Sequence, residues 1–229
     1  MKNIDHKQFF TVLLLSIIIL FFWNYSFIYP LKILTVFFHE ISHGFMAILT
    51  GGKIVEIEIS PQQGGHCITI GGSRFLTVTA GYLGSLFFGG MILLLSSRSN
   101  VNKTLTIVLS LFLLLCTLFW VRPFFGFGFI FCMLMSVLFL FYGIYLTCKM
   151  NKYLLKTIGL TSCLYVFGDI KSDIIDRPDL RSDARILSEI TGVPTLVWGV
   201  FWMFLAFIFG VIFLYMSCKK TQEGFVENN

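Results

Sequence analysis

The sequence predicts an all-α integral membrane protein with about seven transmembrane helices and a short interfacial β-hairpin between the second and third spans. Of its 229 residues, 56% are hydrophobic and 13% are charged, whereas soluble domains carry about 25% charged residues. The mean hydropathy is +0.84. Long apolar runs follow one another with short polar breaks between them, which is the pattern of a multi-span protein. We therefore treat residues 1–229 as a single polytopic membrane domain.

The charged residues favour a membrane partner over a nucleic acid. The formal net charge is +5, but Lys and Arg lie in the polar breaks between apolar runs, where membrane proteins usually carry them. They form no basic segment, so we expect no nucleic-acid partner. The six cysteines include no CxxC pair and most lie in apolar runs, which favours small buried residues over disulfides or a metal cluster.

The first two spans are the apolar run from Phe9 to about Phe27 and the run from about Leu31 to Leu49. The first run is long and lacks a small-residue cleavage site, so we interpret it as an uncleaved span rather than a signal peptide. Pro30 suits the first turn of the second helix, because its missing N–H is not needed there. Gly51 and Gly52 are typical of a helix end.

A β-hairpin is predicted over residues 53–74. The stretch "KIVEIEIS" alternates and would place Val55, Ile57 and Ile59 on one face, and "HCITIGG" alternates again after the turn residues "PQQGG". Two alternating runs around a Pro/Gly turn indicate a hairpin. It is too short and too polar to span a bilayer, so we expect it at or partly in the interface.

The third span runs from about Phe75 to Leu95 and carries a stripe of small residues. Gly81, Ser85 and Gly89 recur every fourth residue, and such a stripe lets another helix approach closely.

The rest of the chain is predicted to hold four more spans. These are at about Leu105–Trp120, Phe124–Cys148, Tyr153–Phe167 and Thr195–Met216. A polar loop over residues 169–194 contains a short helix, which Ser182 or Asp183 could cap and Gly192 would end. Residues 217–229 form a polar tail.

The stretch "FFHEISHG", from Phe37 to Gly44, places three ionisable groups inside the second span. His39 and His43 are four residues apart, so they share one helix face and can offer both imidazoles to one Zn²⁺. Glu40 is rotated by about 100° from His39, which suits a general base for a water molecule at the metal. A charged group at the bilayer centre costs about 2.5–3.5 kcal/mol on insertion scales. A metal site would compensate for that cost.

A catalytic zinc usually takes three protein ligands, and the third is sought among later aspartates. The second and sixth predicted spans run in the same direction, so their C-terminal ends emerge on the same side. Asp169, at the end of the sixth span, is therefore the first candidate, and Asp173, one turn further, is the alternative. Asp183 also remains open. His66 is more simply a polar residue at a strand end.

An ordered set of motifs resembles the site-2 protease superfamily of intramembrane zinc metalloproteases, and within it the B-type branch of membrane peptidase-like proteins. The set is "HEISHG", "LTGG", the hairpin, "AGYLGS", "YVFGDIKSDIIDR", "RSDA" and "VWGVFW". The resemblance implies zinc ligation by His39 and His43 and a catalytic base at Glu40. The superfamily's third ligand is an aspartate in a Leu-Asp-Gly setting. Here "FGDIKSD" stands in that place, so the resemblance points to Asp169.

Together these features predict an intramembrane zinc metalloprotease that hydrolyses peptide bonds of membrane-embedded protein substrates within the lipid bilayer. Two alternatives stay open. One is a non-catalytic scaffold, for which Glu40 would be dispensable. The other is a divalent-metal transporter, although Gly44 stands where resembling transporters carry a further metal ligand. The hairpin could pair with an extended substrate strand, or it could be a rigid cover over the site.

The orientation is predicted from the resemblance. Lys and Arg divide almost evenly between the two sides of a seven-span topology, so the positive-inside rule does not decide. The resemblance places the active site toward the cytosol. We therefore expect a multi-pass protein of the cell membrane with a cytosolic N-terminus, on the same side as the hairpin.

Overall fold

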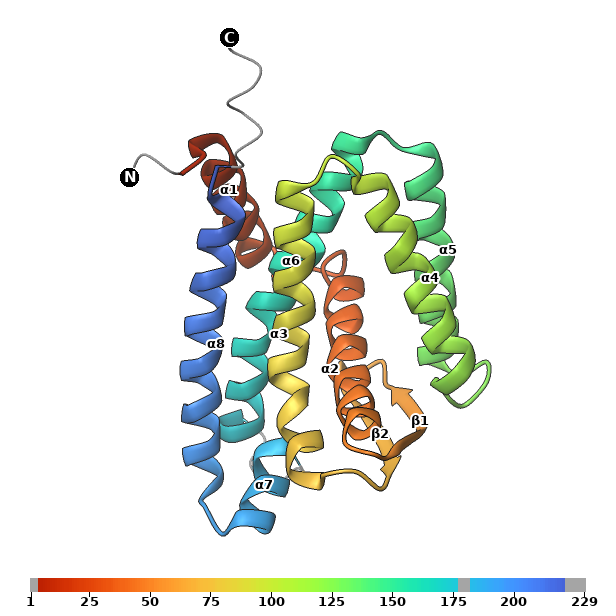
Figure 1. Ribbon diagram of the computed structural model, residues 1–229, viewed down its shortest axis with the longest axis vertical. Coiled ribbons are helices and arrows are strands. Elements are labelled where there is room, and N and C mark those ends of the chain that lie inside the picture. The colour runs from red at the N-terminus through yellow and green to blue at the C-terminus, as the bar shows by residue number, and fades with distance from the viewer. Residues whose placement is uncertain (1–3, 177–181, 221–229) are drawn as a thin grey trace.

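The computed structural model describes residues 4–176 and 182–220 of the chain (Figure 1). Its helices are α1 (His6–Phe21), α2 (Tyr29–Leu49), α3 (Arg74–Arg98), α4 (Asn102–Trp120), α5 (Phe127–Tyr145), α6 (Cys148–Lys171), α7 (Asp183–Thr191) and α8 (Thr195–Cys218), with a π-helical turn η1 (Ser172–Asp176) after α6. The strands are β1 (Lys53–Ile59) and β2 (Gly65–Ile70). The predicted helical fold with one hairpin is confirmed. Part of the predicted polar loop and most of the polar tail lie outside the described residues.

Five helices in the described part of the chain are long and apolar enough to cross a membrane: α2, α3, α4, α5 and α8. Seven spans are therefore not confirmed. Helix α1 has 16 residues, fewer than the roughly 20 that a span needs. Helix α6 is long enough but carries five charged residues: Lys149, Lys152, Lys156, Asp169 and Lys171.

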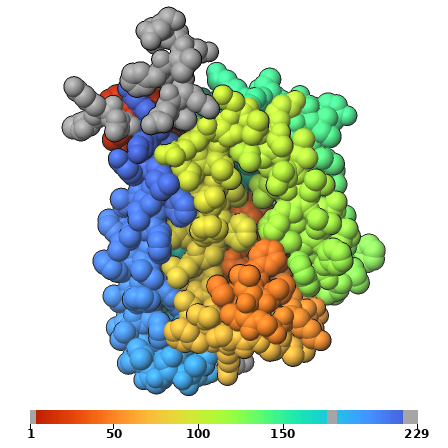
Figure 2. All heavy atoms as spheres, in the orientation of Figure 1, coloured from red at the N-terminus to blue at the C-terminus, as the bar shows by residue number. Residues whose placement is uncertain are grey.

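The outer surface of the long helices suits contact with lipid. Large apolar side chains are exposed along α5 and α8, among them Leu134 (65%), Phe204 (60%) and Phe207 (62%). Helices α8 and α3 lie side by side on the face seen in Figure 2. A soluble protein seldom exposes so many large apolar groups in one region, which agrees with a multi-pass membrane protein.

Helix α3 is central and packs against α2, α6 and α8 (Figure 1). The predicted close approach at its small-residue stripe is confirmed. A Cβ on Gly89 would lie 2.6 Å from the Cβ of Ser162 on α6. The Ser162 hydroxyl donates a hydrogen bond to the carbonyl of Ser85 at 2.8 Å. Small residues thus let α3 and α6 approach closely enough for side-chain to backbone contact.

The hairpin is confirmed as an antiparallel β1–β2 pair, but its predicted faces are wrong in part. The register shifts between Ile54 and Glu56. Ile54, Ile57 and Ile59 are consequently buried, whereas Val55 is 44% exposed. A β-bulge adds one residue to the strand and reverses the alternation on one side of it, which a strict period of two does not anticipate.

The hairpin lies along α2, and its turn reaches the start of that helix. The Tyr29 hydroxyl donates to the carbonyl of Pro61 at 2.7 Å, and the Tyr165 hydroxyl donates to the carbonyl of Gln63 at 3.2 Å. On the outer side of β1, the N–H of Arg122 donates to the carbonyl of Ile57 at 2.9 Å. The hairpin is therefore held between α2, α6 and the α4–α5 connection.

The two ends of the described chain meet at one end of the molecule. The N–H of Asp5 donates to the carbonyl of Cys218 at 2.8 Å, and Ile4 forms a β-bridge with Lys219. The hairpin and α7 lie at the opposite end (Figure 1). The expectation that the N-terminus and the hairpin share a side is therefore wrong. The reason is that α1 is too short to carry the chain from one end to the other.

Reporter fusions test this arrangement. A topology reporter fused at the N-terminus and one fused at the C-terminus should report the same side of the membrane, because the neighbouring residues Asp5 and Cys218 are hydrogen-bonded. A reporter inserted at Gly192, in the exposed turn between α7 and α8, should report the other side. Terminal reporters on opposite sides would contradict the fold.

Candidate metal centre

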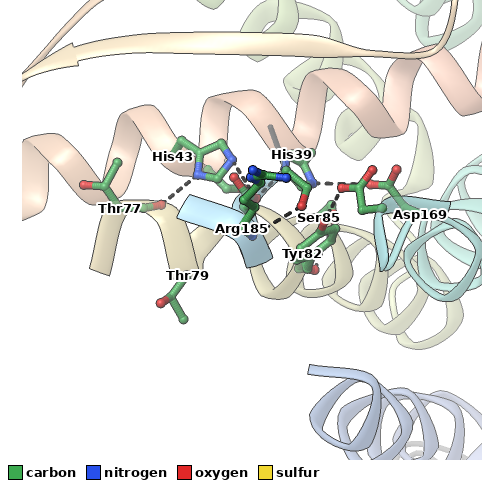
Figure 3. A network of polar contacts seen from close by, with 12 residues as sticks. His39, His43, Thr77, Thr79, Tyr82, Ser85, Asp169 and Arg185 are labelled. Atoms are coloured by element: carbon green, nitrogen blue, oxygen red, sulfur yellow. Dashed lines mark hydrogen bonds and ion pairs between the residues drawn. The ribbon is translucent and has the colours of Figure 1, made fainter. Parts of the chain in front are cut away.

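His39, His43 and Asp183 form a possible metal-binding group in the described part of the chain, with one ligand atom of each within 4.8 Å of the others. The Asp183 Oδ2 atom lies 3.0 Å from Nε2 of His39 and 3.2 Å from Nε2 of His43. Both histidines come from α2, and Asp183 is the first residue of α7. Figure 3 shows the two imidazoles side by side above α3.

The His43 ring is oriented by the backbone of α3. Its Nδ1 lies 2.7 Å from the carbonyl oxygen of Thr77. A carbonyl can only accept, so Nδ1 carries a proton. In the neutral ring, Nε2 then directs a lone pair toward the Asp183 carboxylate. Two facing lone pairs require a cation between them, either a proton or a metal ion.

His39 has a carboxylate near each ring nitrogen. Asp183 faces Nε2, and the Oδ2 atom of Asp169 lies 3.6 Å from Nδ1 (Figure 3). This contact is longer than a hydrogen bond, but a carboxylate at the outer nitrogen of a metal-binding histidine is the usual arrangement for orienting the ring. The structure thus brings Asp169 to the predicted histidine, but on the nitrogen that faces away from the group.

Asp173, the alternative from the sequence, accepts a hydrogen bond from the Tyr82 hydroxyl and is not in the metal-binding group. His66 is also outside it, since its Nε2 lies 3.7 Å from Glu58 Oε2 on the neighbouring strand. The geometry therefore favours Asp183, which the sequence left open, as the third ligand.

A zinc ion fits this group. Ligand atoms at zinc distances of 2.0–2.1 Å and tetrahedral angles lie about 3.3 Å apart. This is close to the 3.0 and 3.2 Å that separate Asp183 Oδ2 from the two Nε2 atoms, and all three ligand atoms lie within 4.8 Å of one another. The facing helix leaves room as well. A Cβ on Gly81 would lie 2.4 Å from Nε2 of His39 and 2.6 Å from Nε2 of His43. Two imidazoles and a carboxylate are also an ordinary donor set for catalytic zinc.

Asp183 is held in place by the way α7 begins. Ser182 caps the helix, its hydroxyl oxygen accepting from the N–H of Arg185 at 3.3 Å, and Gly192 ends it with φ 73°. The predicted short helix is confirmed. Leu187 is fully buried and, being four residues after Asp183, shares its helix face. That spacing is the signal in the sequence that could have placed Asp183 on the buried side of α7.

The charge state of Asp183 also suits metal binding. Burial alone would raise the pKa of its carboxyl, but the two imidazoles beside it outweigh that effect and hold the pKa below its usual range. Asp183 therefore stays a carboxylate, the form that binds a metal ion.

Glu40 lies on a different face of α2 from the histidines, as predicted. A Cβ on Gly65 would lie 2.9 Å from its Oε1 atom, so the carboxylate faces strand β2. It is 6% exposed, and no residue in the described part of the chain hydrogen-bonds to it. Glu40 is thus beside the metal-binding group and has its oxygens available to a ligand in the cleft.

A cleft of about 840 Å³ joins these groups, lined by α2, β2, the start of α3 and the start of α7. His39, Glu40, His43 and Asp183 are all on its walls. Cys67 of β2 lines it too, but burial and the charge of Glu40 raise the pKa of its thiol to about 12. Cys67 therefore remains a thiol and is no candidate nucleophile.

The comparison with known families covers most of the chain. A family model described as Peptidase M50B-like matches residues 12–213. The chain belongs to this family. The M50 family are zinc metalloproteases, so the resemblance to the site-2 protease superfamily is confirmed, and with its apolar helices the chain is a multi-pass membrane protein. Searches of curated proteins and of solved structures found no match.

Substitution of Gly81 tests whether the space beside the two imidazoles is needed. Gly81→Ala should lower zinc affinity by at least about tenfold, the effect typical of changes around a metal site, because the added methyl group would collide with both Nε2 atoms. Gly168→Ala is the matched control, since a methyl group added at this position on α6 would have nothing within 4 Å. Affinity is measured by competition with a chelator. Equal affinity in both variants would contradict the geometry.

The same measurement of zinc affinity distinguishes the roles of the three aspartates. Asp183→Ala should lose the zinc, because a ligand is removed. Asp169→Ala should bind it about 10–100-fold more weakly, as expected for a carboxylate that only orients a ligand. Asp173→Ala should keep it. Loss of zinc in Asp169→Ala with retention in Asp183→Ala would restore the assignment that the sequence favoured.

Proposed function

We propose that this chain is an intramembrane zinc metalloprotease that hydrolyses peptide bonds of membrane-embedded protein substrates. The observation that carries the proposal is the Asp183 carboxylate lying against both imidazoles of the HExxH helix, with Glu40 on the wall of the same cleft. Membership of a peptidase family supports it.

Metal binding, proton transfer and orientation of the imidazoles would be carried out by different residues of the site. A zinc ion held by His39, His43 and Asp183 would polarise the scissile carbonyl and make a nearby water more acidic. Glu40 would accept the proton of that water and pass it to the leaving amine. Thr77 and Asp169 face the outer nitrogens of His43 and His39 and would keep both rings oriented while the proton moves.

Strand β2 is the proposed contact for the substrate backbone. Its residues Gly65–Thr69 line the cleft, and in the described part of the chain its outer edge has no strand partner. An extended peptide could add to this edge through main-chain hydrogen bonds, which would make recognition tolerant of sequence. The hairpin also covers Glu40, so the role of a rigid cover is compatible with the same geometry.

The two alternatives differ from the protease in what they require of the site. A transporter needs a path of further metal ligands. The position after His43 is Gly44, however, and the side chain of Ile54 occupies the space where a side chain at this position would begin. A scaffold does not need Glu40 as a base. Burial of Glu40 at the cleft wall, without a hydrogen-bond partner in the described part of the chain, favours the enzyme.

We further propose that the protein lies in the cell membrane with the cleft toward the cytosol, as the family resemblance implies. The two ends of the described chain would then be on the opposite side, because they lie at the end of the molecule away from the hairpin (Figure 1).

Substitution of Glu40 distinguishes the protease from the transporter and the scaffold. Glu40→Gln keeps the size of the side chain but removes the base, so it should keep about one zinc per chain and lose peptide hydrolysis by at least about 100-fold, the low end for general-base catalysis. The measurement compares membrane-protein fragments in cells carrying wild type or Glu40→Gln. The matched control is Glu189→Gln, which changes a half-exposed carboxylate on α7. If no fragment depends on Glu40, the chain is not a protease.

A further inference from the structure

Helix α2 carries one more charged residue on the face of the metal-binding histidines. Lys32 is seven residues before His39, which is close to two helical turns, so the two side chains leave the helix in nearly the same direction. Only 8% of Lys32 is exposed. A buried ammonium group on the same face as a catalytic site calls for an explanation.

Lys32 lines a second, smaller pocket that adjoins the cleft. The pocket has a volume of about 250 Å³. Its other walls include Trp23, Gln62, Gln63, Tyr165, Asp169 and Ser172. Gln63 and Asp169 also line the large cleft. A ligand that lies in the cleft can therefore extend into the pocket.

The ammonium group of Lys32 has no carboxylate partner in the described part of the chain. The Nζ atom of Lys32 lies 4.6 Å from the centre of the Trp23 ring, a contact that stabilises a cation but does not neutralise it. Asp169, the acidic residue of the pocket, directs its carboxylate to His39. Within residues 4–176 and 182–220, no carboxylate forms an ion pair with Lys32. A buried charge is costly unless it is paired, so the pocket suits an anionic ligand.

We propose that this pocket binds a carboxylate of the peptide substrate, namely an acidic side chain about three residues from the scissile bond. The inference rests on the proposed protease function. Seven residues of α2 rise about 10.5 Å, and an extended peptide covers that distance in about three residues. The Gln62 and Gln63 side chains on the wall carry amide groups that can donate to the second carboxylate oxygen. Lys32 is thus a specificity-determining residue.

The test uses apolar peptides of about 20 residues, the length of one span, in detergent micelles. The peptides differ only in the position of a single Glu or Gln, and cleavage sites are read by mass spectrometry. Wild type should cut peptides with Glu at one fixed distance from the cut at least about tenfold faster than their Gln counterparts, a modest effect for a buried charge pair. Lys32→Gln should abolish this preference, and Lys32→Arg should retain it. Lys32→Glu should prefer Lys at the same position in a matched peptide set.

Controls separate specificity from folding and from other anions. Lys149→Gln changes an exposed lysine at the start of α6 and should keep the preference for Glu. Zinc content shows that each Lys32 variant is folded. Vesicles with and without an anionic phospholipid are tested for Lys32-dependent thermal stabilisation. If only the anionic lipid stabilises the wild type and the Glu peptides do not, the ligand is a headgroup and the proposal is wrong.

Binding distinguishes failure of this inference from failure of the protease assignment. The affinity of Glu40→Gln for the same Glu and Gln peptides is measured beside that of Glu40→Gln combined with Lys32→Gln. A Lys32-dependent preference for Glu without any cleavage by wild type would keep the pocket and overturn the protease. Glu40-dependent cleavage with no acidic preference, or with a preference that Lys32→Gln retains, would overturn the pocket and keep the protease.

Discussion

The carboxylate of Asp183 lies against two imidazoles that belong to a helix about 144 residues earlier in the chain, and this contact fixes where α7 meets α2. Removing water from three ionisable groups is costly unless they neutralise one another or share a cation. Helix α7 packs through Leu187 onto a buried cluster that includes Tyr82 and Trp202. This packing brings the Asp183 carboxylate to the two imidazoles and so meets the condition. The apolar cluster supplies the stability, and the Asp183 contact fixes where the helix begins.

Helix α3 contacts both imidazoles and packs against α6 and α7. Gly81 gives the imidazoles their space, and the Thr77 carbonyl fixes the proton of His43. Tyr82 packs its ring edge against His39 with centroids 5.0 Å apart, donates its hydroxyl to Asp173 and packs against Trp202 with centroids 4.8 Å apart. A shift of α3 would therefore change both the metal-binding group and the seat of α7.

Local periodicity could be read from the sequence, whereas contacts made across the fold could not. The separation of Glu40 from the face of His39 and His43 follows from the helical repeat and holds in the structure. The choice between Asp169 and Asp183 depends on where α7 returns, and that is set by tertiary packing. The bulge at Val55 likewise depends on how β1 meets α2. The count of seven spans is not confirmed, since α1 ends at Phe21 whereas its apolar run in the sequence continues to about Phe27.

The two faces of α2 explain how an apolar bundle can hold a cluster of ionisable groups. One face offers imidazoles to α3 and α7, and the face about 100° away offers Glu40 to the hairpin. Because the hairpin turn reaches Tyr29 and Tyr165, a polar strand edge accompanies the whole length of α2. The cleft between that strand and α2 is therefore lined by polar groups inside an exterior of exposed Phe and Leu side chains. The backbone groups of β2 that have no strand partner in the described part of the chain lie beside these polar groups, so the cleft offers hydrogen-bonding partners that a lipid-facing surface could not supply.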